Sequence, residues 1–116
     1  MLFSAERIAG CDLEQVCQRD GKVWEQLLGQ QEFALARRLA GASNGAFDSA
    51  ATQVWTMKES LRKAGCSFSP PMCLSASSPD GWASFSAGRF KGTTFCTQIN
   101  GAESNCAFGF VIDNTP

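Results

Sequence analysis

The sequence predicts an α+β domain in which helices pack on one face of a small, mostly antiparallel sheet. Three features predict it: an apolar run at residues 3–14 that ends in carboxylates, an amphipathic stretch at 48–65, and short alternating runs after Cys66. Helices and strands are thus segregated along the chain, which is typical of α+β folds. At 116 residues the chain can form one core but not two, so residues 1–116 are predicted to be a single domain.

The first part of the chain is predicted to contain one strand and two short helices. The strand covers about residues 3–14. A helix begins near Val23 and breaks at Gly29, and a second helical run covers residues 31–39. The small residues at 41–46 are typical of a loop.

The stretch at 48–65 is predicted to be a helix with recognisable ends. Asp48 or Ser49 can cap its N-terminus, because a short side-chain oxygen accepts a hydrogen bond from the unpaired N–H groups of the first turn. Gly65 can end it, because glycine adopts the left-handed conformation without steric cost.

Two stripes of side chains run along this predicted helix. Val54 and Leu61 lie seven residues apart, on the face that we expect to pack against the sheet. Trp55, Glu59 and Lys63 are spaced four residues apart, so they form a neighbouring stripe in which we expect Trp55 to pack.

The last third of the chain is predicted to be an antiparallel meander. Its alternating runs are residues 72–77, 82–87, 92–99 and 107–112. Residues typical of turns separate them, at 79–81, 88–91 and 100–105. Runs of this length with such punctuation indicate strands joined by hairpins.

Three carboxylates are the candidate functional residues. Asp12 and Glu14 are two residues apart in the predicted first strand, so their side chains point to the same face. If the helix brings Glu59 to them, the result is an oxygen-rich site. Such a site suits a hard divalent cation such as magnesium, which also binds water and phosphate oxygens.

Composition excludes several classes of function. The net charge of −1 gives no electrostatic reason to expect binding to nucleic acid or to a membrane surface. The apolar runs are much shorter than the roughly 20 residues that a membrane span requires. The N-terminal residues lack the basic region and apolar core of a signal peptide, so we predict a cytoplasmic protein.

The chain has six cysteines and no histidine. No Cys-x-x-Cys pair occurs, which disfavours a structural zinc site and leaves free, buried thiols as the prediction. Without histidine, acid–base chemistry near neutral pH must use carboxylates, lysines or metal-bound water.

Two segments resemble the signature motifs of the 4′-phosphopantetheinyl transferases. Gly10-Cys-Asp12-Leu-Glu14 resembles the first motif, and Trp55-Thr-Met-Lys58-Glu59-Ser60-Leu-Arg-Lys63 resembles the second. The likeness is to the surfactin-type branch and covers roughly residues 6–66. It implies a 4′-phosphopantetheinyl transferase-like module, whose order of strand, helices and strands agrees with the fold predicted above.

The resemblance implies transfer of 4′-phosphopantetheine from coenzyme A to a serine of an acyl or peptidyl carrier protein. Asp12 and Glu59 would bind Mg²⁺, or alternatively Mn²⁺, with Glu14 as third ligand or orienter. Glu59 would also accept the serine proton, and Lys63 would meet the phosphate or the departing adenosine bisphosphate. Lys58 would either cross the edge of the core or reach coenzyme A.

The chain departs from the surfactin-type pattern because it begins just before the first acidic motif, without a preceding half of similar size. The resemblance therefore implies a homo-oligomer, one part of a larger synthase, or a degenerate fragment. Two other functions stay open. One is a non-catalytic docking or structural module of a polyketide or fatty-acid synthase, and the other is a different magnesium-dependent phosphotransferase.

Overall fold

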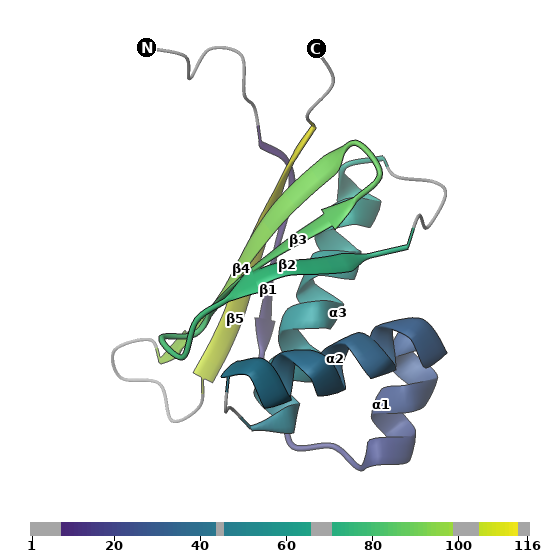
Figure 1. The fold of residues 1–116 in the computed structure, drawn as a ribbon, viewed down its shortest axis with the longest axis vertical. Helices are drawn as coiled ribbons and strands as arrows, with labels where there is room; N and C mark the ends of the chain where they lie inside the picture. Colours follow the sequence, from purple (N-terminus) through teal and green to yellow (C-terminus); the bar gives the residue numbers. More distant parts are fainter. Residues whose placement is uncertain (1–7, 44–45, 66–70, 99–104, 114–116) are drawn as a thin grey trace.

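The computed structural model describes residues 8–43, 46–65, 71–98 and 105–113, which form three helices and five strands (Figure 1). In chain order the elements are β1 (Ile8–Gln15), α1 (Gly21–Leu28), α2 (Gln30–Ser43), α3 (Phe47–Lys63), β2 (Cys73–Ser77), β3 (Trp82–Ala87), β4 (Phe90–Gln98) and β5 (Asn105–Asp113). The order of strand, helices and strands confirms the α+β prediction. No helix among these residues is long and apolar enough to cross a membrane.

All five described strands form one antiparallel sheet in the order β1-β5-β4-β3-β2. Strands β2 to β5 are the predicted meander, because each pairs with its neighbour in sequence. The first strand of the chain joins the last one, and this pairing puts β1 at an edge of the sheet. A contact between segments so far apart in sequence could not be read from local patterns.

The helices lie together on one side of the sheet (Figure 1). Helix α3 packs directly on β1, β5 and β4, and α2 packs on α3 and β2. The apolar face predicted for α3 is confirmed, since Val54 is fully buried and Leu61 is 8% exposed. On the sheet, Phe85 and Val111 complete the same core beneath the helix.

The predicted N-terminal cap of α3 is wrong. The cap residue is Ala46, which offers no side-chain acceptor, and the helix begins at Phe47. Asp48 instead accepts hydrogen bonds from the indole Nε1 of Trp24 at 2.8 Å and from the backbone N–H of Arg19 at 3.1 Å. Its carboxylate therefore ties α3 to α1 and the segment before it, because these partners compete successfully for the oxygen that a local cap would use.

The predicted helix ends are corrected at one position and confirmed at two others. Helix α2 continues to Ser43, so the first part of the predicted 41–46 loop is helical. The stop signals at Gly29 and Gly65 are confirmed, since both have φ of 85° just beyond a helix end.

The prediction of buried thiols is wrong for the described residues. The five cysteines among them are free, but none is buried, and Cys11 and Cys73 are exposed. Cys66 lies outside the described residues.

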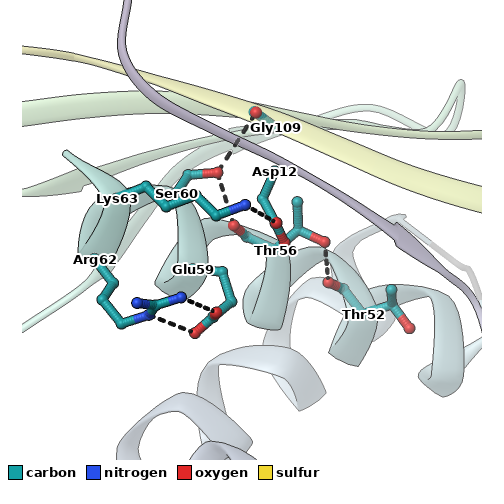
Figure 2. Close-up of polar contacts among 8 residues, drawn as sticks. All are labelled: Asp12, Thr52, Thr56, Glu59, Ser60, Arg62, Lys63 and Gly109. Atoms are coloured by element: carbon teal, nitrogen blue, oxygen red, sulfur yellow. Dashed lines mark hydrogen bonds and ion pairs between the residues drawn. The ribbon is translucent and has the colours of Figure 1, made fainter.

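The last turn of α3 lies unusually close to β1. A Cβ atom at Gly10 would overlap the carbonyl oxygen of Ser60 and would lie 2.8 Å from the backbone nitrogen of Ala64. The Ser60 hydroxyl donates to the carbonyl of Thr56, 2.8 Å away in its own helix, and also contacts the carbonyl of Gly109 on β5 at 3.5 Å (Figure 2). Because backbone cannot move aside as a side chain can, only glycine fits at position 10.

We predict that Gly10→Ala destabilises the fold by about 1–3 kcal/mol, the usual cost of overpacking a well-packed interior. The cause is the overlap with the backbone of Ser60 and Ala64. Urea unfolding followed by circular dichroism measures the change.

Gly41→Ala in α2 is the matched control, because its added Cβ would meet nothing within 4 Å. It should be neutral or stabilising by up to about 1 kcal/mol, since alanine favours helix over glycine. Equal stability for Gly10→Ala and the wild type would contradict this account of the close approach.

Candidate functional site

Asp12 and Glu14 point toward α3 from the edge strand β1. In the register they pair with Gly109 and Ala107 of β5, two positions that are buried beneath the helix. The prediction that both carboxylates share one face is therefore confirmed. That face is the one that α3 covers, so the two acids lie between strand and helix.

An ion pair joins the two segments of the predicted motifs. Lys63, the last residue of α3, donates from Nζ to Oδ1 of Asp12 at 2.7 Å (Figure 2). The Asp12 side chain is 6% exposed, whereas the Lys63 side chain is 48% exposed. The bond to Asp12 raises the pKa of Lys63 above its ordinary value. Residues 51 positions apart in the chain thus meet at this point.

The second oxygen of Asp12 has no hydrogen-bond partner among the described residues, although it is buried. A buried carboxylate oxygen without a partner is costly, because it has lost its water and gained nothing in return. Glu14 can donate a hydrogen bond to this oxygen only when Glu14 is protonated, because an ionised carboxylate has no proton to donate. Asp12 therefore has its charge paired with Lys63 but one oxygen left without a hydrogen bond in the described residues.

The pKa of Glu14 is raised by its surroundings, Asp12 among them. Desolvation, hydrogen bonding with Asp12 and repulsion from Asp12 and Glu59 together raise the pKa of Glu14 to about 7. The hydrogen bond with the Trp55 indole acts in the opposite direction, because it favours the ionised form. Glu14 therefore changes charge near neutral pH. Asp12 and Glu59 thus both act electrostatically on Glu14.

Glu59 itself is engaged elsewhere. Both of its oxygens accept from the Arg62 guanidinium, at 2.8 Å from Nη2 and 3.3 Å from Nε, and this pair is drawn in Figure 2. Arg62 is 66% exposed, so the pair lies at the surface. This partner of Glu59 was not predicted from the sequence, although the i,i+3 spacing on a helix was a usable signal.

The three carboxylates do not form a ready-made metal site. Within the described residues, no three His, Cys, Asp or Glu side chains are grouped so that they could hold a metal ion. The chemistry of the donors nevertheless fits a hard cation: Asp12 has a buried unpaired oxygen, and Glu14 is destabilised in its charged form by its acidic neighbours. A divalent cation would give the second oxygen of Asp12 a partner and would balance the charge of Glu14, which no ion pair of the described residues balances.

Lys58 lies away from this ion pair. Its Nζ donates at 3.0 Å to the carbonyl of Leu28, the last residue of α1. An ammonium at a helix C-terminus satisfies a carbonyl that the helix leaves unpaired. This contact gives Lys58 a role in joining α1 to α3, whereas its predicted role toward coenzyme A stays a prediction.

A hollow of about 190 Å³ lies at the other end of α3, between its first turns and the turn before β3. Ser49, Gln53 and Asp80 are among the residues that line it. None of the five residues predicted for the site, namely Asp12, Glu14, Lys58, Glu59 and Lys63, does so. The carboxylates instead lie at the open edge of the domain.

Comparison with protein-family models, with curated proteins and with solved structures finds no significant match to this chain.

The raised pKa of Glu14 predicts a stability that falls as pH rises. Between its unfolded value of 4.5 and about 7, the folded state holds the proton more tightly than the unfolded state does. The favourable contribution is complete below pH 4.5 and is lost by about pH 7. Glu14→Gln should therefore stabilise the protein relative to the wild type at pH 8 more than at pH 4, as measured by urea unfolding.

Glu25→Gln is the matched control, because it removes an exposed carboxylate from α1, away from the acidic group. A stability difference for Glu14→Gln that is the same at pH 4 and pH 8 would contradict the assignment.

Proposed function

We propose that this chain transfers 4′-phosphopantetheine from coenzyme A to a serine hydroxyl of an acyl or peptidyl carrier protein, in a magnesium-dependent reaction. The observation that carries the proposal is the Asp12–Lys63 ion pair, because it joins the two segments that resemble the family's motifs. The other two acidic residues of those segments are linked to this pair, because Asp12 and Glu59 both act electrostatically on Glu14.

Asp12, Glu14 and Glu59 are the residues that would hold the metal. Magnesium, when bound, supplies positive charge that neutralises the pyrophosphate of coenzyme A. To take part, Glu59 must leave Arg62. The loss is small, because exposed ion pairs contribute only about 0–1 kcal/mol. Asp12 needs no such exchange for its second oxygen, which has no partner in the described residues.

Glu59 can accept the proton that the reaction releases, and Lys63 can neutralise the negative charge of the phosphate groups. The serine oxygen forms a bond to the β-phosphorus of coenzyme A, and the bond from that phosphorus to the bridging oxygen breaks. Glu59 accepts the serine proton as general base. Lys63, half exposed at the end of α3, neutralises the phosphate or the departing adenosine 3′,5′-bisphosphate. These roles use charged groups that lie at the surface and can reach a substrate.

The proposal includes a cytoplasmic location and a carrier protein as partner. A non-catalytic synthase module with the same fold would need neither the unpaired oxygen of Asp12 nor the raised pKa of Glu14. A different magnesium-dependent phosphotransferase would use the same carboxylates, and it is distinguished only by its substrate.

The transfer reaction is tested by intact mass spectrometry of apo carrier proteins incubated with the chain, coenzyme A and Mg²⁺. We expect a mass gain of one phosphopantetheine that disappears in EDTA. Glu59→Gln should lower the rate by about 10²–10⁴-fold, the usual contribution of a general base.

Glu25→Gln on α1 should keep the wild-type rate, and circular dichroism should show that every variant is folded. No transfer to any carrier protein by the folded chain would contradict the proposed activity. Unchanged transfer by Glu59→Gln would contradict the role of Glu59.

Magnesium binding is tested separately from activity. At ten times its Kd, Mg²⁺ should stabilise the fold by about 1.4 kcal/mol and raise the Tm by about 5 °C. Asp12→Asn should abolish the rise, because it removes charge at the buried, unpaired oxygen. Differential scanning fluorimetry measures the shift, with Ca²⁺ and NaCl at equal ionic strength as controls. An equal rise in Asp12→Asn would mean that the ion acts elsewhere.

A further inference from the structure

The sheet has a second face, which no described helix or strand covers. The three helices lie on one side, above inward-facing residues such as Ala107, Gly109 and Val111 of β5. Side chains alternate along a strand, so Phe108 and Phe110 point to the opposite side. We call this opposite side of β1, β5, β4 and β3 the outer face.

The outer face is apolar where β1, β5 and β4 meet. Leu13 is 60% exposed and Phe108 is 39% exposed, although both are large hydrophobic residues. Leu13 pairs with Phe108 across β1 and β5, and Phe108 pairs with Phe95 across β5 and β4. The rings of Phe95 and Phe108 stack, with centroids 5.1 Å apart and planes inclined at 22°.

The apolar surface continues along the strands toward Ile112. Cys11 pairs with Phe110, and Ile8, which is 64% exposed, pairs with Ile112. A hollow of about 320 Å³ opens beside Phe110 and Ile112. The apolar side chains therefore form one continuous surface that contains a hollow, rather than a set of isolated exposed residues. Surfaces of this kind are typical of protein interfaces.

The charge on this face points to a neutral partner. In the described parts of β1, β5, β4 and β3, the alternation places a single charged side chain on it, that of Lys91. A charged peptide or an acidic protein would find almost nothing to pair with. A second copy brings an equally neutral surface, and a net charge of −1 opposes the approach of two copies only weakly.

The size of the face suits a two-copy interface. Strands β1, β5, β4 and β3 have eight, nine, nine and six residues. At about 3.3 Å per residue and about 4.8 Å between strands, four strands give a face of about 500 Å². Two such faces would together bury about 1,000 Å², which is the size at which a specific interface becomes credible.

We propose that two copies of this chain pack their outer faces together as a two-layer β-sandwich. Two-fold symmetry lets the same surface serve both copies, and sheets packed in this way lie about 10 Å apart. Phe95, Phe108 and Leu13 would form its apolar centre. The inference is independent of the proposed activity, because Asp12 and Glu14 point to the other side of the sheet.

Sedimentation velocity of the whole chain from about 1 to about 300 µM tests the proposal, since this range covers the affinities of small interfaces. We expect a reversible monomer–dimer equilibrium, and a Tm that rises with protein concentration. Leu13→Lys and Phe108→Lys should each weaken the dimer at least about tenfold, because two-fold symmetry puts two uncompensated charges into one interface.

Leu27→Lys is the matched control, because Leu27 on α1 is 38% exposed, almost as much as Phe108. It should leave the dimerisation constant unchanged. Circular dichroism checks that each variant is folded. If Phe108→Lys does not fold, Leu13→Lys alone tests the interface. A wild type that stays monomeric at the highest concentration would overturn the proposal. An assembly larger than a dimer would also overturn it. A dimer that Leu27→Lys dissociates and the two outer-face variants do not would overturn it as well.

Discussion

The close approach of β1 and the last turn of α3 is the constraint on which the rest of the structure depends. Gly10 has no side chain, so the backbone of Ser60 and Ala64 can lie directly against the strand. Two residues further along β1, Asp12 forms an ion pair with Lys63, which lies between Ser60 and Ala64 in the last turn of α3. Packing and charge are thus coupled, because a helix held further from the strand would leave Asp12 in water and Lys63 without its partner.

The same approach explains why the acidic residues are poorly balanced. Burial removes water from Asp12, yet only one of its oxygens has a partner in the described residues, and Glu14 reacts by holding its proton to about pH 7. Basic residues are near, but Arg62 is occupied with Glu59 at the surface. Folded proteins seldom keep such an arrangement for stability alone, since it opposes folding. It is consistent with a site that is completed by a cation or a charged substrate, as proposed above.

The antiparallel sheet separates two surfaces of opposite character. Alternation along β1 sends Asp12 and Glu14 toward α3 and sends Leu13 to the uncovered side, where it meets Phe108. A single strand therefore contributes both to the acidic group and to the apolar outer face. Because the two surfaces lie on opposite sides of one sheet, ligands at one need not obstruct a partner at the other. The proposed dimer would leave both acidic groups open to substrate.

Local patterns in the sequence were enough to predict the features that depend on local geometry. Period-two alternation predicted β3 at its observed bounds, helical spacing predicted the buried stripe of Val54 and Leu61, and glycine predicted the end of α3 at Gly65. Strand period alone also placed Asp12 and Glu14 on one face. These features follow from steric preferences within a few residues, which any chain with this pattern would share.

Only the tertiary structure decided which groups meet across the chain. It paired β1 with β5, gave Asp48 to Trp24 rather than to its own helix, and directed Lys58 to the carbonyl of Leu28. It also decided that Lys63 reaches Asp12, 51 positions away in the chain. Each of these contacts is one of several that the local sequence permits. The choice is made by burial and by the positions of neighbouring elements, which exist only when the whole chain has folded.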